Sequence, residues 1–347
     1  MPKPTALELF EDLLSVAAPS GAEAEMGRSV GHHLDAFDWP YETDPSGNLV
    51  VEIAGSDPEA PTCALLAHMD EIAMVVTAVE ESGSLRVSPS GGLYPWKLGE
   101  GAVDVLGDVQ TLVGVLSMGS GHAPNLEKRP IEWESVFIRT GLSKEAVNDA
   151  GVRPGTPAVP AAARRGPVIF GDPHDPMIGA WTFDNRVSVV AVLRMLATLR
   201  EEEIEPAHPW MVAFTTHEET GCHGAKSLAH RLRAEVVFAI DGCPIMPGID
   251  VALDGRLGIR SKDPVAIYDQ RLLRQALCVA ERANVALEPI VYARSSTEAA
   301  QIFAMGGAAR VASLGAVRAN SHGYEVMRHA TFDNLTRLLV DLVQERF

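Results

Sequence analysis

The chain has 347 residues, and its 29 Lys and Arg against 46 Asp and Glu give a formal net charge of −17. With 46% apolar and 22% charged residues, the composition is that of a folded chain and excludes a disordered one, and the length favours two domains. The acidic balance argues against nucleic acid and against an anionic membrane surface as partners, because both attract clustered Lys and Arg.

The beginning of the chain and its cysteines bear on cellular location. Residues 1–20 carry apolar side chains at helical spacing, interrupted by Glu and Asp, which does not match the core of a signal peptide. No run of about 20 uncharged apolar residues exists, so we expect no membrane-spanning helix. The four cysteines form no CxxC pair, which argues against a zinc ribbon or a disulfide scaffold. We therefore expect a cytoplasmic protein.

Helices and strands alternate along most of the chain. Five stretches have helical apolar spacing: residues 5–17, 21–36, 185–203, 268–284 and 332–345. Four short apolar runs rich in β-branched residues lie between them: residues 62–67, 210–216, 235–240 and 309–314. Runs that are apolar on both faces are typical of strands in a helix-covered sheet. The pattern predicts an α/β fold.

Residues 73–175 differ, because no long helical pattern occurs there. Val-rich alternating runs such as MVVTAVEE, DVQTLVGVLSM and VFIRT are separated by Gly, Pro and Ser, as between short strands. We expect a small β-rich domain over 73–175, inserted into an α/β domain formed by 1–72 and 176–347.

Side chains that can bind metal follow the carboxyl end of each predicted strand. In chain order these candidates are His68 and Asp70, Asp184 at the start of the long helix, Glu218 and Glu219, Asp241, and His322. Sites in open α/β sheets form at the carboxyl ends of strands, so their convergence is a specific signal, although each residue alone is a weak one. The mixed nitrogen and oxygen set suits zinc, cobalt or manganese, and it can give each of two ions three ligands and an open position.

The spacing of the candidates indicates roles. Asp70 lies two residues after His68, on the same side of an extended chain, so its carboxylate can accept a hydrogen bond from the imidazole and fix the tautomer. Glu218 and Glu219 point in different directions, so one can bind metal while the other faces the water that a general base deprotonates. Asp184 can cap a helix, bridge two cations, or do both.

The segments PSGAE, GNLV, AHMDE, FDNR, HEETG, AIDG and NSHG, in this order, resemble the dinuclear metallo-aminopeptidases of peptidase family forty-two, of the glutamyl and tetrahedral aminopeptidase type. The resemblance runs from Pro19 to about Asn334. It implies a zinc-peptidase-like mixed central sheet with helices on both faces, and a dimerisation domain inserted at 73–175. It also implies a metal-dependent enzyme that removes N-terminal residues from peptides. Family members form homo-oligomers, in which dimers build tetrahedral dodecamers.

The same resemblance assigns a role to each candidate residue and implies two divalent ions per subunit, zinc or cobalt first and manganese as an alternative. The ligands would be His68, Asp184 and Asp241 for one ion and Asp184, Glu219 and His322 for the other. Glu218 would be the general base acting on a water that bridges the metals, and Asp70 would orient His68.

Two alternatives use the same residues. Another dinuclear amidohydrolase, such as a carboxypeptidase or a deacylase, would need no free amine on its substrate. A non-catalytic assembly protein would keep the metal but would have no use for a base at Glu218. The chain departs from the family pattern at Ala73, where Gly is usual, and at Glu298, where Asp is usual. Near the candidates we expect Cys222 to be a small packed side chain and His122 to be exposed.

Overall fold

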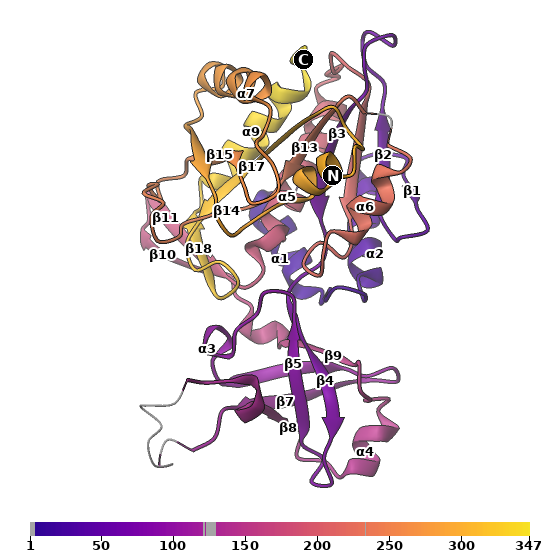
Figure 1. Ribbon diagram of the computed structural model, residues 1–347, viewed down its shortest axis with the longest axis vertical. Helices are drawn as coiled ribbons and strands as arrows, with labels where there is room; N and C mark the ends of the chain where they lie inside the picture. Colours follow the sequence, from indigo (N-terminus) through magenta and orange to yellow (C-terminus); the bar gives the residue numbers. More distant parts are fainter. Residues whose placement is uncertain (1–3, 121, 123–129, 233) are drawn as a thin grey trace.

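The computed structural model describes residues 4–120, 122, 130–232 and 234–347. It has two parts that follow one another along the long axis: a sheet covered by helices, and a β-barrel below it (Figure 1). Among the helices of these residues, none is long and apolar enough to cross a lipid bilayer.

Within the described ranges, nine strands form the central sheet. In spatial order they are β1 (Glu42–Thr43), β2 (Leu49–Ile53), β12 (Trp210–Thr215), β3 (Cys63–His68), β13 (Val236–Ile240), β17 (Arg310–Arg318), β15 (Leu257–Lys262) and β16 (Leu287–Val291), with β14 (Cys243–Pro244) also paired to β17. The four middle strands β12, β3, β13 and β17 are parallel. Because β2 runs antiparallel to β12 and β15 runs antiparallel to β17, the sheet is mixed, as the resemblance implied.

Helices cover both faces of this sheet, and the middle strands are apolar on both faces for that reason. In β3, Leu65 and Ala67 pack into one core, while Ala64 and Leu66 pack into the other. The first core is covered by α1 (Ala6–Ser15), α2 (Ala24–Ala36), α5 (Phe183–Glu201), α7 (Gln270–Arg282) and α9 (Thr331–Val343). The second is covered by α6 (His223–Ala229) and α8 (Glu298–Ala304). The four predicted strands and five predicted helices are confirmed to within a few residues.

Directly after β3 the chain leaves the sheet and forms the barrel. Its closed strand order is β4 (Ala73–Val79), β5 (Leu85–Ser90), β8 (Phe137–Arg139), β7 (Thr111–Ser117), β6 (Gly101–Leu106) and β9 (Pro157–Pro160). Short helices α3 (Pro95–Leu98) and α4 (Lys144–Asp149) and the 3₁₀ turns Trp133–Ser135 and Ala162–Arg164 connect the strands. The alternation in β7 sends Leu112 and Leu116 into the barrel core and leaves Val113 and Val115 exposed. The expected β-rich part is therefore a closed barrel.

A small antiparallel sheet lies beside the central one. It consists of β10 (Val168–Asp172), β11 (Asp175–Ala180) and β18 (Glu325–Arg328). The domain boundary expected at residue 175 falls at the turn between β10 and β11. The division into 1–72, 73–175 and 176–347 stays a prediction.

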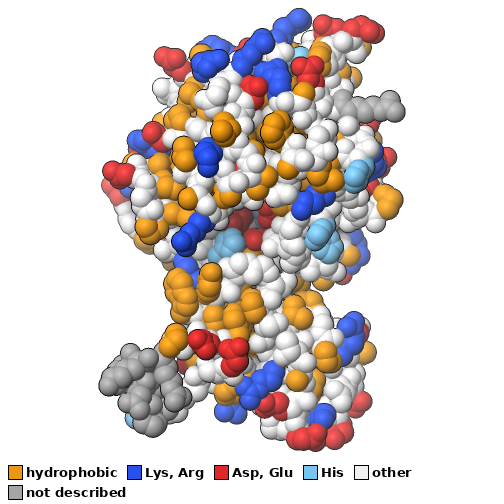
Figure 2. Space-filling model, viewed as in Figure 1, with side chains coloured by type: hydrophobic (Ala, Val, Ile, Leu, Met, Phe, Trp, Pro, Cys, Tyr) orange, Lys and Arg blue, Asp and Glu red, His pale blue; other side chains and the backbone are white. Residues whose placement is uncertain are grey.

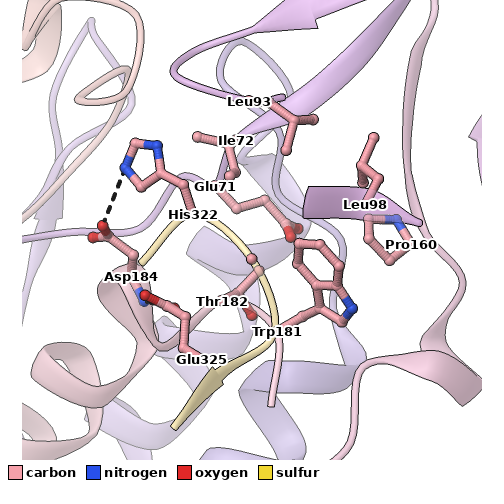
Figure 3. Close-up of a pocket in the computed structure, with 11 residues that line it drawn as sticks. Glu71, Ile72, Leu93, Leu98, Pro160, Trp181, Thr182, Asp184, His322 and Glu325 are labelled. Atoms are coloured by element: carbon pink, nitrogen blue, oxygen red, sulfur yellow. Dashed lines mark hydrogen bonds and ion pairs between the residues drawn. The ribbon is translucent and has the colours of Figure 1, made fainter. Parts of the chain in front are cut away.

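A buried ion cluster joins the barrel to the sheet. Glu71 follows β3, and its Oε1 accepts hydrogen bonds from Nη1 of Arg165 at 3.2 Å and Nη2 of Arg186 at 3.4 Å. It also accepts from the backbone of Ala18 at 2.7 Å, and none of the three charged side chains is more than 1% exposed. Figure 3 shows Glu71 close to the indole of Trp181, among the apolar side chains of this junction.

Candidate metal site

Strand order brings the candidate residues together. The middle strands are parallel neighbours, so their carboxyl ends meet at one edge of the sheet. His68 is the last residue of β3, Asp241 follows β13, and Glu218 and Glu219 follow β12 after a short turn, while His322 comes from the loop after β17. Acidic and histidine side chains gather in a hollow just above the barrel in Figure 2.

Three sets of these side chains lie close enough to share an ion, with one atom of each residue within 4.8 Å of the others. The sets are His68, Asp184 and Asp241; Asp184, Glu219 and His322; and His68, Glu218 and Glu219. The first two coincide with the ligand sets that the resemblance implied. The third contains Glu218, which the resemblance assigned as the base.

Asp184 lies between the two imidazoles. Its Oδ1 is 3.2 Å from Nε2 of His68, and its Oδ2 is 3.5 Å from Nε2 of His322 (Figure 3). The N-cap residue of α5 is Thr182, and the φ and ψ of Asp184 are −80° and 101°, outside the helical region. The carboxylate therefore faces the histidines, the position that a bridging ligand requires.

The other three carboxylates are crowded and desolvated. Burial raises the pKa of Glu219 to about 8, and the nearby negative charge of Asp184 adds to this effect while His322 opposes it. Burial also raises the pKa of Glu218 well above its ordinary value and raises that of Asp241. Buried carboxylates that repel one another are unfavourable unless a cation lies among them.

Asp184 behaves in the opposite way. Burial alone would raise its pKa, but the positive charge of Arg318 and hydrogen bonds from His322 and His68 hold it well below the ordinary value. The histidines respond in turn: burial lowers the pKa of His322, but Glu219 and Asp184 outweigh this and raise it to about 10.

Asp70 contacts more than His68. Its Oδ1 is 3.4 Å from Nδ1 of His68, and its backbone carbonyl oxygen is 3.2 Å from the same nitrogen, so both groups of Asp70 face this side of the imidazole and the orienting role stays a prediction. Its carboxylate also accepts hydrogen bonds from the backbone amides of Glu218 at 2.9 Å and Glu219 at 3.1 Å, and from the hydroxyl of Ser20 at 2.6 Å. Asp70 thus links one histidine to the loop that carries both glutamates, which spacing alone did not reveal.

Two buried arginines behind the carboxylates were missed by sequence reasoning. Arg318 forms an ion pair with Asp184, and its Nε donates to Glu325 at 2.5 Å. Arg260 lies 3.8 Å from Oδ2 of Asp241. Each arginine directly follows a run of apolar or glycine residues in its strand, 257–259 before Arg260 and 314–317 before Arg318, and that was the available signal. Gly242 is required beside them, because a Cβ there would lie 0.8 Å from Nη1 of Arg318.

The two residues noted outside the set lie as expected. Cys222 is buried, and its thiol donates to Oε1 of Glu218 at 3.2 Å. His122 is exposed.

The side chains fit divalent cations. Two imidazoles with several carboxylates form the donor set typical of zinc and related ions. Oε1 of Glu219 is buried and has no hydrogen-bond partner among the described residues, so it has an unused lone pair beside the cluster.

A cavity of about 800 Å³ opens in front of these carboxylates. The barrel side contributes Tyr94, Trp96 and Lys97 to its wall, and the sheet side contributes Lys226 and Arg294. The acidic residues among its lining are Asp184, Glu218, Glu219 and Asp241, all members of the candidate cluster. The space suffices for several residues of an extended peptide.

A helix-covered α/β sheet with histidines and carboxylates at its strand ends is the arrangement of a metal-dependent hydrolase. Comparison with known proteins identifies the family of hydrolases. Residues 47–338 match the family described as M42 glutamyl aminopeptidase. The chain belongs to this family of metallopeptidases and is a peptide-bond hydrolase, which confirms the resemblance seen in its motifs.

Individual relatives agree with this assignment. The chain is 26% identical to the putative aminopeptidase FrvX of Escherichia coli, over 89% of this chain and 86% of the relative. It is 23% identical to the glutamyl aminopeptidase of Lactococcus lactis, over 92% and 91%. Among solved structures, it is similar to the TET1 peptidase of Pyrococcus horikoshii, with a TM-score of 0.86, 25% identity and coverage of 98% and 100%. That peptidase can assemble into a tetrahedron or a large octahedral shell.

Proposed function

We propose that this chain is an aminopeptidase that removes N-terminal residues from peptides with two divalent ions per subunit, zinc or cobalt, with manganese as an alternative. The observation that carries the proposal is the position of Asp184, which belongs to two ligand sets and lies between two histidines. His68, Asp184 and Asp241 would hold one ion, and Asp184, Glu219 and His322 the other.

When bound, the ions would polarise the scissile carbonyl as Lewis acids and lower the pKa of water at the site. Glu218 is the proposed general base: it lines the cavity, and burial makes its carboxylate more basic than an exposed one. It would take a proton from the attacking water and deliver it to the leaving amine. Asp70 would hold the tautomer of His68 through Nδ1 and the loop of Glu218 through the backbone.

The decisive experiment uses metal-stripped protein reloaded with zinc, cobalt or manganese. We expect release of free N-terminal residues from aminoacyl-anilides and short peptides, and a loss of activity in Glu218→Gln with two ions still bound per chain. Glu81→Gln, an exposed glutamate of the barrel, is the matched control and should behave as the wild type.

Other outcomes would redirect the assignment. Loss of one ion in Glu218→Gln would make Glu218 a ligand, as the third set allows. Turnover only of N-acylated or C-terminal substrates would favour a deacylase or a carboxypeptidase. Two bound ions with no turnover of any substrate would favour the assembly protein.

We further propose that the chain forms a homo-oligomer in which residues 73–175 serve as the dimerisation domain and dimers build a dodecamer. The TET1 relative, which can assemble into a tetrahedron or a large octahedral shell, supports the homo-oligomer, and Val113 and Val115, which are 67% and 51% exposed on the outside of the barrel, support the barrel as a contact surface. Light scattering of the wild type and of Val113→Asp tests the proposal, because a charge in the interface should dissociate the particle. The cytoplasmic location stays a prediction for cell fractionation.

A further inference from the structure

The loop between β12 and α6 carries Glu218 and Glu219, and side chains from other segments hold its backbone. Four successive backbone amides, from Thr216 to Glu219, each donate a hydrogen bond to such a side chain. The acceptors are Oδ1 of Asn48 for residue 216 at 3.0 Å, Oε1 of Glu23 for residue 217 at 3.0 Å, and the two carboxylate oxygens of Asp70 for residues 218 and 219 at 2.9 and 3.1 Å.

Glu23 is a buried carboxylate used for this purpose. It is 7% exposed and stands at the N-cap position of α2, yet it makes no side-chain cap hydrogen bond. Its Oε1 instead accepts from the amides of His217 and Gly21, both at 3.0 Å. Two residues earlier along the chain from Gly21, Pro19 forms a β-bridge with Glu71, so the segment is fixed to the sheet beside β3.

The conformation at His217 explains why the loop needs such support. Its φ is 54°, in the left-handed region that is sterically unfavourable for a residue with a Cβ. Strained backbone of this kind persists when surrounding contacts determine it. Since His217 directly precedes Glu218, relaxation of φ at His217 would redirect the carboxylates that follow.

Asn48 closes the loop at both ends. While its Oδ1 accepts from Thr216, its Nδ2 donates to the carbonyl of Gly224 at 3.1 Å and to Asp44 at 2.7 Å. Gly224 permits this approach, because a Cβ there would lie 2.4 Å from the carbonyl oxygen of Thr216. The segments PSGAE and GNLV therefore both contact this loop, through Glu23 and Asn48 respectively.

We infer that Glu23 and Asn48 are positioning residues for Glu218 and Glu219. Neither is among the residues that line the cavity, and each acts through the backbone of the loop. The catalytic part of the inference rests on the proposed function, whereas the loop restraint does not depend on it.

The test compares Glu23→Ala and Glu23→Gln with Glu25→Ala, which changes an exposed glutamate at the start of the same helix that pairs with the exposed Arg28. In Glu23→Ala we expect kcat to fall about 10–100-fold and KM to stay within about threefold, since misplacing a reacting group costs turnover more than binding. Hydrogen exchange of the 216–219 amides should rise about tenfold or more, as local opening becomes easier. Glu23→Gln keeps an oxygen acceptor, so its kcat and the slow hydrogen exchange of its 216–219 amides should be close to those of the wild type. Glu25→Ala should match the wild type in both measurements.

Two results would overturn the inference. One is a Glu23→Ala variant whose hydrogen exchange and kcat equal those of the wild type. The other is a Glu23→Gln variant as impaired as Glu23→Ala, because this result would show that the charge of Glu23 matters and its acceptor oxygen does not. If even the wild type shows no peptidase activity, the proposed function fails, and exchange at 216–219 alone decides the inference. If Glu23→Ala does not fold, Glu23→Asp retracts the acceptor by one methylene, and the same comparison of kcat and exchange applies.

Discussion

The ion cluster around Glu71 offers a direct test of how the barrel is held to the sheet. Glu71→Gln keeps the shape of the side chain but removes the negative charge that faces Arg165 and Arg186. The amide oxygen can still accept from Ala18. The amide nitrogen would replace Oε2, which has no partner among the described residues, so the variant would bury one unpaired donor and two uncompensated arginines.

The expected cost follows from these contacts. At 3.2 Å and an effective dielectric constant of about 20, each Arg–Glu contact contributes about 5 kcal/mol of Coulomb attraction, which desolvation of the three groups largely offsets. Breaking a buried pair by removing one partner typically destabilises by about 3–5 kcal/mol, because the remaining charge stays buried. Burial and Arg165 already lower the pKa of Arg186 to about 10, and the variant would remove Glu71, which opposes them.

The assay is urea unfolding of the metal-free protein, followed by the combined fluorescence of its five tryptophans, one of which, Trp181, lies at this junction. A loss of about 3–5 kcal/mol is a large part of a typical total of about 5–15 kcal/mol and is readily measured. Glu81→Gln, which breaks only an exposed contact with Lys144, should leave the midpoint unchanged. A loss below about 1 kcal/mol for Glu71→Gln would refute the reasoning, since that is the range of exposed ion pairs.

The remaining predictions concern the metal site, its cavity and the thiols. Asp184→Asn should lower the affinity for both ions, whereas His322→Ala should remove one and leave the other, as measured by equilibrium dialysis and metal analysis. Substrates with an acidic N-terminal residue should be preferred over basic ones, because Lys and Arg side chains line the cavity outside the candidate cluster. In Arg294→Ala, the kcat/KM for an acidic substrate divided by that for a basic one should fall several-fold. Iodoacetamide should modify the exposed Cys278 and spare Cys222, because burial raises the pKa of the Cys222 thiol far above its ordinary value. Modification of both cysteines in the folded protein, detected by mass spectrometry, would contradict this prediction.

The parts of the fold that could be predicted are those in which a local residue pattern is compatible with a single type of secondary structure and burial. Strand β3 is apolar on both faces and ends at His68, so both its burial and the direction of its carboxyl end could be inferred. Strand β16 has a half-exposed pattern, and it was not predicted because its burial depends on a neighbour distant in sequence. Closure of the barrel was missed for the same reason, since alternation within a strand does not specify its partners.

The candidate site divides in a similar way. The carboxyl-end rule collected six of the seven proposed residues, because it depends only on strand direction, while Asp184 was found from the start of a predicted helix. The ion pair between Asp184 and Arg318 and the contact of Glu23 with His217 join segments far apart in the chain. No local pattern reports such contacts. The left-handed conformation of His217 is likewise imposed by its surroundings, because nothing in its own residue type requires it.

The two connections between sheet and barrel have a consequence for communication within an assembly. The chain enters the barrel a few residues after His68, and its return leads through β11 to Asp184. Both connections therefore pass within a few residues of two side chains that lie 3.2 Å apart at the centre of the candidate site. A neighbouring subunit that displaced the barrel would act on chain segments within a few residues of both side chains. Allosteric control of turnover by assembly would then need no dedicated regulatory domain.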